Sequence, residues 1–254
     1  TVEAREVALR VKTPYSALGL YETAISGILA HCTGWATAAR ECVDAANGTP
    51  VVGVGARNVH PNVAANIDYS SVVAGCASCT TILGARLSGI TPSGNMPHSL
   101  PLLLGDTVRA VQAFDRHMPQ EVPRVALVDT FKDEAEEALI VARALGEKLR
   151  GIRLDTPRER GGVTPDLVKE VRARLDLVGF RHVEIIVSGG FTPERIALFI
   201  ERGAPVSSFW VGSYISSARP NDFTADIHEI DGKPIAKRGR TPGVTVNPRL
   251  DRVM

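Results

Sequence analysis

The chain has 254 residues, of which 29 are basic and 28 acidic, so its formal net charge at pH 7 is +1. This balance gives no global field that would favour nucleic acid or an anionic membrane as a partner. No apolar run approaches the ~20 residues of a membrane span, and no signal-peptide pattern opens the sequence. We therefore expect a cytoplasmic protein with one large domain, alone or with a small appendage.

The first half of the sequence predicts packing elements. Apolar residues recur at helical spacing from Ala24 to Ala46, which predicts a long helix with one apolar face. Pro50–Arg57 has the pattern of a short buried strand that ends at Gly55 and Arg57. We expect Ser71–Ala74 to be extended and Ser78–Leu87 to form a helix of small residues.

Thr91–Ser99 contains two prolines and a glycine, so it can form neither a regular helix nor a central strand. It is therefore expected to be a shaped loop that presents His98. A histidine in such a loop can serve as an acid, a base or a phosphoryl acceptor. The alternative is a structural histidine, which is the commoner role of a lone one.

The second half alternates strands with helices at regular intervals. The predicted strands are Arg124–Val128, Gly151–Leu154, Val183–Val187 and Ser208–Val211. They end at Asp129, Asp155, Ser188 and Gly212. Repeated strand-helix units predict parallel strands, and polar residues at successive strand ends are typical of the active face of an α/β barrel. An open doubly wound sheet fits the same spacing.

Two of these strands end in glycine-rich turns. Ser188-Gly189-Gly190 precedes a helix that Thr192 and Pro193 open, and Gly212-Ser213 follows the next strand. Such turns expose backbone N–H groups to a phosphate. The alternative is that the glycines only make tight connections between strands and helices.

The strand ends and the loop predict one shared face of candidate site residues. These are Arg57, His98, Asp129, Arg153, Asp155, Ser188, Gly189, Gly190, Gly212 and Ser213. Two arginines and two glycine turns suit a ligand with more than one anionic group. The two aspartates suit ribose hydroxyls, a magnesium ion or a cationic centre. Arg153 and Asp155 face the same side of a strand, so a simple buried ion pair is the alternative.

The two ends of the chain carry weaker signals. The sequence begins at Thr1, and Val7–Val11 has the pattern of a strand already inside a structure, so we expect that an N-terminal portion is absent. Near the other end, Asp231-Gly232 predicts the turn of a hairpin, and Lys233–Arg240 is basic. That basic run is either a solvated tail or a rim that reaches phosphate.

The sequence resembles the nicotinate phosphoribosyltransferases, most closely their archaeal and bacterial branch, from about Pro14 to Gly243. The resemblance rests on Gly55–Arg57 with His60-Pro61, Gly94–Ser99, Val128–Phe131, Gly151–Asp155, Ser188–Gly190 with Pro193–Arg195, and Val211–Ser213. Each motif alone is weak. The six in the right order make a specific match.

The resemblance implies a fold and a domain organisation. The expected fold is the irregular parallel α/β barrel of the type II phosphoribosyltransferases, with remnants of a second α+β domain. Residues 1–20 would be the end of an otherwise absent N-terminal domain, 21–220 the barrel, and 221–254 a C-terminal hairpin and basic tail. The family is usually dimeric, so a homodimer or higher oligomer is expected.

The resemblance also implies a reaction. The family joins nicotinate to 5-phosphoribosyl 1-pyrophosphate and forms nicotinate mononucleotide, with ATP hydrolysed through a phosphohistidine and with Mg²⁺ required. Nicotinate, phosphoribosyl pyrophosphate and ATP are therefore the expected small-molecule partners, with no nucleic acid and no membrane. The sequence identifies no magnesium ligands.

Individual roles follow from the resemblance residue by residue. His98 would be the phosphorylated histidine, Arg153 would bind the nicotinate carboxylate, and Asp155 would face the ribose. Gly189, Gly190 and Gly212 would hold the 5′-phosphate and Ser213 would contact it, while Arg57 and Ser188 belong to the same substrate-binding set.

Several residues depart from the family pattern, among them Asn58, Ala77, Ser78, Asn95 and Trp210. Asn95 replaces the usual threonine, which would alter a contact to the pyridine or its carboxylate. Trp210 stands where the resemblance implies a glycine of the phosphate turn, so a bulky side chain would enter the place where backbone approaches the ligand. These departures leave two alternatives: a phosphoribosyltransferase for quinolinate or another pyridine acid, or a catalytically lapsed relative that binds phosphorylated ligands.

Overall fold

The computed structural model describes residues 2–253 and divides them into two compact units. One unit joins the chain up to His31 to the chain from Asn221 onward, and the other is Cys32–Pro220. The boundary falls within helix α2 (Glu22–Ala45). Each unit is described by itself.

Besides the part of α2 up to His31, the smaller unit contains little regular structure other than helix α1 (Tyr15–Leu18) and a hairpin of β7 (Glu229–Ile230) and β8 (Lys233–Pro234). The hairpin turns at Asp231-Gly232, where both residues have positive φ, as the sequence predicts. The expected strand at residues 7–11 is wrong, because these residues form no strand. Leu9 and Val11 are each 47% exposed, so the apolar pattern there has no partner to pack on.

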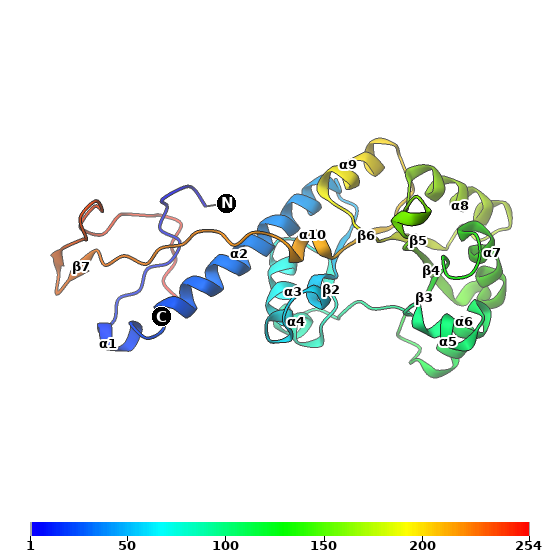
Figure 1. The fold of residues 1–254 in the computed structure, drawn as a ribbon, viewed down its shortest axis with the longest axis horizontal. Coiled ribbons are helices and arrows are strands. Elements are labelled where there is room, and N and C mark those ends of the chain that lie inside the picture. Colours follow the sequence, from blue (N-terminus) through cyan, green and yellow to red (C-terminus); the bar gives the residue numbers. More distant parts are fainter. Residues whose placement is uncertain (1, 254) are drawn as a thin grey trace. The chain divides into compact units, whose positions relative to one another are not determined.

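The larger unit is built on six parallel strands that curl into a half-barrel (Figure 1). In spatial order they are β2 (Ser78–Cys79), β1 (Val51–Gly53), β6 (Ser208–Val211), β5 (Glu184–Val187), β4 (Leu149–Leu154) and β3 (Arg124–Leu127). The predicted α/β barrel class is therefore confirmed, in an irregular form whose described edge strands are β2 and β3. The parallel pairing brings the carboxyl ends of these strands to one edge.

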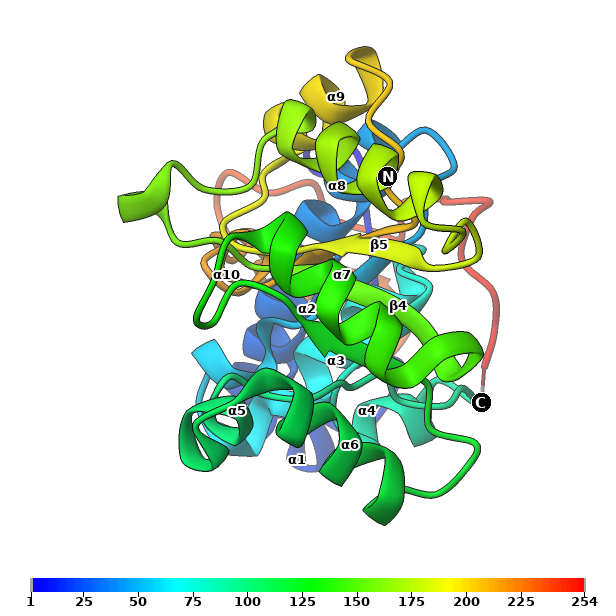
Figure 2. The ribbon, with the colours of Figure 1, turned by 90° about the vertical axis from the view of Figure 1, so that its right-hand side faces the viewer.

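Helices connect the strands and cover the sheet. They are α3 (Ala64–Val73), α4 (Ile82–Leu87), α5 (Ser99–Leu104), α6 (Thr107–His117), α7 (Glu134–Leu145), α8 (Pro165–Leu177), α9 (Pro193–Glu201) and α10 (Ser213–Ser216), with short 3-10 turns η1 (Gly55–Asn58), η2 (Pro61–Val63), η3 (Gly146–Lys148) and η4 (Arg158–Arg160). Figure 2 shows α7 in front of β4, with α8 beside it. This layer separates one face of the sheet from solvent.

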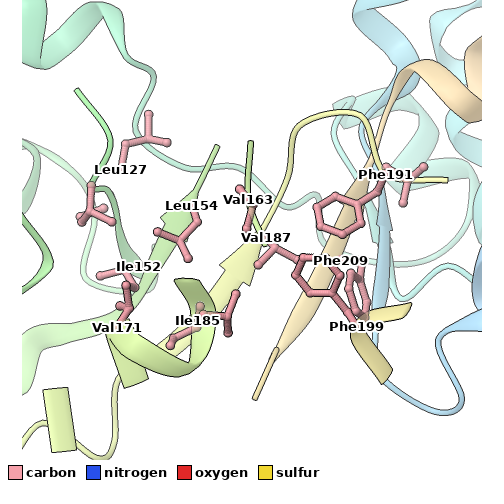
Figure 3. Packing of buried hydrophobic residues seen from close by; sticks show 14 of the residues in the cluster. Leu127, Ile152, Leu154, Val163, Val171, Ile185, Val187, Phe191, Phe199 and Phe209 are labelled. Carbon is pink, nitrogen blue, oxygen red and sulfur yellow. The ribbon is translucent and has the colours of Figure 1, made fainter. Parts of the chain in front are cut away.

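Alternate strand residues bury the outer face of the sheet against these helices. Ile152 and Leu154 of β4 and Ile185 and Val187 of β5 lie in one apolar cluster with Val171 of α8 (Figure 3). Next to them, three phenylalanines pack edge to face: the ring centroids of Phe191 lie 5.1 Å from Phe199 and 5.4 Å from Phe209. Burial of such rings contributes on the order of 2 kcal/mol each to folding.

Strand residues that alternate with these face the opposite side of the sheet and form a separate small cluster. It consists of Val52, Val125, Ile186 and Trp210, with Val54 packed against it. Because successive side chains on a strand point to opposite faces, these residues line the inside of the half-barrel. They form the apolar floor beneath the strand ends.

Two predicted elements are wrong, and both lie between β1 and α5. Residues 71–73 belong to helix α3 rather than being extended, and Ala74 is the C-cap of this helix. Inside the helix, the hydroxyls of Ser70 and Ser71 donate to the carbonyls of Asn66 and Ile67. The predicted helix at 78–87 begins instead as strand β2, and helix α4 starts only after Thr81 accepts a hydrogen bond from Gly84 N–H.

Candidate active site

The carboxyl edge of the half-barrel gathers the predicted strand-end residues. Arg153 on β4 pairs in register with Leu127 on β3 and Ile186 on β5, and Val187 pairs with Phe209 on β6. Each strand therefore stops at the same level, and the residues that follow it share one edge. Asp129, Asp155, Ser188 and Gly212 reach this edge as the sequence predicts.

His98 meets Asp129 at this edge. The histidine precedes α5 at the end of the irregular segment, and its Nε2 lies 3.1 Å from Asp129 Oδ2. The Asp129 side chain is 2% exposed, whereas that of His98 is 35% exposed. The hydrogen bond to Asp129 raises the pKa of His98, against the lowering effect of burial, and the charge of Asp155 adds to the rise.

Asp155 is held between Arg153 and Ser188. Its Oδ2 lies 3.7 Å from Arg153 Nη2, and its Oδ1 accepts a hydrogen bond of 2.8 Å from the Ser188 hydroxyl. Ser188 is itself buried, and its hydroxyl also lies 3.3 Å from the carbonyl oxygen of Leu154. The Ser188 hydroxyl, predicted to contact substrate, thus points at Asp155 and orients that carboxylate.

Arg153 lies over the indole ring of Trp210. Its guanidinium carbon is 5.3 Å from the ring centroid, which is cation–π geometry. Burial lowers the pKa of Arg153, the charge of Arg57 lowers it further, and the charges of Asp155 and Asp129 oppose the change. Arg57, an exposed residue of the 3-10 turn after β1, therefore lies within electrostatic reach of Arg153.

The placement of Trp210 in a phosphate turn is wrong. Trp210 lies within β6, opposite Val52 of β1, and its indole packs into the inner apolar cluster. The turn comes two residues later, at Gly212. The bulky ring therefore forms the floor under Arg153 and leaves the backbone of the turn uncovered.

The two glycine turns differ in their physical basis. Gly189 and Gly190 both have positive φ, of 95° and 67°, which an L-residue with a side chain adopts only under strain. The N–H groups of Gly189, Gly190 and Phe191 have no hydrogen-bond acceptor within the described chain. Gly212 has negative φ, and a Cβ there would lie 3.3 Å from the carbonyl oxygen of Val54, so its glycine is explained by close packing. Ser213 is exposed at the start of α10.

Buried polar atoms without partners mark the same edge. Within residues 2–253 these atoms are Asn95 Nδ2, Asp129 Oδ1, Thr130 Oγ1, Arg153 Nε and Asp68 Oδ1. Asp129 and Arg153 are site residues described above, Thr130 follows Asp129 directly, and Asn95 stands three residues before His98 in the same irregular segment. A buried polar group without a hydrogen bond costs about 1–3 kcal/mol, so a ligand with polar atoms would stabilise this edge.

Two acidic residues on α7 support the site, and the sequence analysis missed both. Glu137 accepts hydrogen bonds from the Thr107 hydroxyl and from Thr130 N–H at 2.9 Å. Glu134 accepts them from the Thr156 hydroxyl at 3.0 Å and from Arg160 at 3.2 Å. Acidic residues in a first helical turn normally indicate only the helix dipole, which is why the pattern did not reveal this role.

The fold is that of an α/β barrel, and the candidate site lies at the carboxyl ends of its strands, where barrels of this kind place their active sites. Residues 35–226 match the model of the quinolinate phosphoribosyl transferase C-terminal domain, and the chain belongs to this family. The resemblance to nicotinate phosphoribosyltransferases is confirmed by similar proteins of that name. The chain is 33% identical over 217 residues to nicotinate phosphoribosyltransferase pncB2 of Mycobacterium tuberculosis, covering 84% of this chain and 46% of that protein. It is 24% identical over 238 residues to nicotinate phosphoribosyltransferase of Bacillus subtilis, covering 91% and 48%.

Solved structures agree. The crystal structure of nicotinate-nucleotide pyrophosphorylase from Pyrococcus furiosus is 45% identical with a TM-score of 0.83, over 91% of this chain and 58% of that one. Human nicotinic acid phosphoribosyltransferase shares the fold at 20% identity and a TM-score of 0.63, over 78% of this chain and 50% of that one. The chain spans about half the length of the curated relatives it matches. Among residues 2–253, no helix is both long and apolar enough to cross a membrane.

Proposed function

We propose that the protein is a nicotinate phosphoribosyltransferase, which joins nicotinate to 5-phosphoribosyl 1-pyrophosphate and couples this to ATP hydrolysis through a phosphohistidine. The observation that carries the proposal is that the His98–Asp129 pair, the Arg153–Asp155 pair and the Gly189–Gly190 turn lie at one strand edge. The family match and the names of the similar proteins support the same reaction class.

Arg153 is suited to bind the carboxylate of a pyridine acid. Guanidinium pairs bidentately with carboxylate, and its Nε is buried without a partner. The contact with Trp210 fixes the guanidinium plane, so little side-chain entropy is lost on binding. Asn95, which departs from the family pattern, stands in the segment before His98, and its amide nitrogen is also buried without a partner.

Asp155 is suited to the transfer step. The pyridine nitrogen attacks C1 of the ribose with its lone pair while the C1–O bond breaks, and the bonding electrons leave with pyrophosphate. Positive charge develops on C1 and the ring oxygen, and a carboxylate nearby stabilises it. Ser188 keeps Asp155 in position for this role.

His98 is suited to accept a phosphoryl group from ATP. If Nε2–H donates to Asp129, the Nδ1 lone pair is free to attack the γ-phosphorus, and ADP leaves with the bonding electrons. Water then cleaves the phosphohistidine. The Asp129 carboxylate stabilises the positive imidazole that forms when the Nδ1–P bond is made.

Magnesium fits the site as an ion that arrives with substrate. The described residues contain no group of three or more His, Cys, Asp and Glu side chains that could hold a metal. They do offer the unpartnered Asp129 Oδ1 and the Asp155 carboxylate. Mg²⁺ commonly binds through one or two carboxylates plus substrate phosphates, and when bound it would neutralise charge on the departing pyrophosphate.

A second candidate is a phosphoribosyltransferase for quinolinate, because the matching family model carries that description and a structure 45% identical is named nicotinate-nucleotide pyrophosphorylase. Quinolinate has a second carboxylate, and Arg57 is a second arginine, within electrostatic reach of Arg153. The alternative of a catalytically lapsed relative that binds phosphorylated ligands loses one of its arguments, because Trp210 packs in the inner apolar cluster and not in the glycine turn. A homodimer or higher oligomer remains a prediction.

The test is turnover by the full-length protein with phosphoribosyl pyrophosphate, Mg²⁺ and either nicotinate or quinolinate, with and without ATP. We expect nicotinate mononucleotide from nicotinate, ATP stimulation, and acid-labile phosphate on His98. His98→Ala should abolish the labelling and the ATP stimulation. A His98→Ala variant that keeps ATP coupling would remove the role of His98, and turnover of quinolinate alone would favour the second candidate.

A further inference from the structure

An arginine of the segment between β4 and α8 lies against the Gly189–Gly190 turn. This segment, lime green in Figure 2, projects at the strand ends and contains the 3-10 turn Arg158–Arg160. A Cβ atom added to Gly190 would lie 3.0 Å from Arg158 Nη2 and 3.6 Å from its Cζ and Nε. The guanidinium therefore occupies the space beside Gly190 that any larger residue would need.

The Arg158 guanidinium has no protein partner to explain its position. Within the described chain its side chain makes no hydrogen bond and no ion pair, whereas its neighbour Arg160 pairs with Glu134. Arg158 is exposed, so its charge is available to a ligand. The turn beside it presents the three unpartnered backbone N–H groups of residues 189–191.

A second arginine fixes the turn from behind. Arg195 donates hydrogen bonds to the carbonyl oxygens of Gly189 and Gly190, the latter at 3.2 Å, and to Val163 O at 2.6 Å. Its guanidinium carbon lies 4.5 Å from the centroid of the Phe191 ring. Because Nη1 and Nη2 donate to these carbonyls, Arg195 holds the turn and the segment of Val163 together. Arg158 is the arginine beside the turn whose guanidinium has no hydrogen bond within the described chain.

Two guanidinium groups close to one turn repel each other in the absence of an anion. The pKa of Arg195 is lowered by burial first and then by the charge of Arg158, which places the two groups within electrostatic reach. Within residues 2–253 no carboxylate forms an ion pair with either group to offset this repulsion. A dianionic phosphate on the turn would offset it and accept the free N–H groups.

We propose that Arg158 pairs with the phosphate ester of the ribose unit at the Gly189–Gly190 turn, and that Arg195 is a positioning residue that shapes this turn. The inference deepens the proposed function and rests on it. Arg158 supplies a side-chain charge at a phosphate site for which the sequence predicts glycine turns and the Ser213 hydroxyl. It would distinguish phosphorylated from unphosphorylated ribosides.

The test compares a nucleotide with its nucleoside. Calorimetry measures binding of nicotinate mononucleotide and of nicotinate riboside to the full-length protein and to Arg158→Gln. We expect the variant to bind the nucleotide about 10–100-fold more weakly and the riboside as the wild type does, because a charge-assisted bond to phosphate is worth ~1.5–3 kcal/mol. Arg158→Lys should recover part of the affinity for the nucleotide. The matched control is Arg181→Gln, an exposed arginine away from the turn, which should bind both ligands normally.

The outcomes separate the inference from the proposed function. Unchanged nucleotide affinity in Arg158→Gln, or an equal loss for nucleotide and riboside, would overturn the role of Arg158 and leave the proposed function standing. If the wild type bound neither pyridine ligand, the proposed function would fail. In that case, calorimetry with inorganic phosphate tests the role of Arg158 by itself. Phosphate binding to the wild type that weakens in Arg158→Gln supports this role, and absence of phosphate binding to the wild type refutes it.

Discussion

The charge of a single carboxylate governs His98. Asp129 is almost fully buried, and its hydrogen bond to Nε2 is the largest cause of the raised pKa of His98. The raised pKa has two consequences. The imidazole stays protonated to higher pH, and the neutral form, which the proposed phosphoryl transfer requires, predominates only above the raised pKa. The same pair therefore couples stability and reactivity to pH.

We predict that Asp129→Asn lowers the pKa of His98 in an NMR titration. In the wild type the folded pKa exceeds the unfolded value of about 6.5, so the pair's contribution to stability is complete below that value. It is lost as pH rises through the folded pKa. The variant should lack this loss when unfolding is measured across the same range, whereas Asp166→Asn, an exposed change in the first turn of α8, should keep it. An unaltered His98 titration in Asp129→Asn would show that another group sets the pKa.

The sequence predicted the positions of some site residues but not the partners of their side chains. Asp129, Asp155 and Ser188 follow predicted strands, so their shared edge was predicted from periodicity alone. Their partners were not: a hydrogen bond of 2.8 Å between Ser188 and Asp155 depends on the stagger of two strands that no pattern specifies. Arg158 lay in a segment without periodicity, and only the space beside Gly190 reveals it.

Helix α7 links two strand-end loops to the core. Its buried Glu137 accepts N–H groups of Thr130 and, at 3.4 Å, Phe131, which follow Asp129 directly. Its Glu134 holds Thr156, which follows Asp155 directly. The position of both site aspartates therefore depends on one helix turn.

We predict that Glu137→Ala lowers the free energy of unfolding by about 2–4 kcal/mol, because it leaves two backbone N–H groups and one hydroxyl without acceptors. Urea unfolding measures this. Glu136→Ala on the same helix is the control: its side chain is exposed and pairs only with Lys132, so its effect should stay within about 0.5 kcal/mol. Equal effects of the two substitutions would contradict the assigned role of Glu137.

Elements with local start signals were predicted well. The predicted start of α9 at Thr192-Pro193 is confirmed, because the threonine hydroxyl accepts a hydrogen bond from the first turn. Thr164-Pro165 opens α8 in the same way. Strand β2 was missed because two residues are too few for a pattern, and its pairing with β1 is decided by tertiary contacts. Residues 71–73 were missed because they continue a helix that begins at Ala64, which a four-residue pattern does not reveal.

At the scale of the molecule, periodicity allowed both a barrel and an open sheet. The resemblance favoured the barrel, and the six curled parallel strands confirm it. The inner face could not be predicted, because its members Val52, Val125, Ile186 and Trp210 come from four separate strands. Their packing places the indole of Trp210 beneath Arg153, so the ring does not lie in the turn at Gly212.

The most direct test of the shared site is a crystal structure of the full-length protein with nicotinate mononucleotide. We expect the phosphate on the N–H groups of Gly189 and Gly190 beside Arg158, the pyridine carboxylate against Arg153 above Trp210, and the ribose facing Asp155. A nucleotide bound away from this edge, or bound here with its phosphate turned away from Gly189–Gly190, would contradict the account.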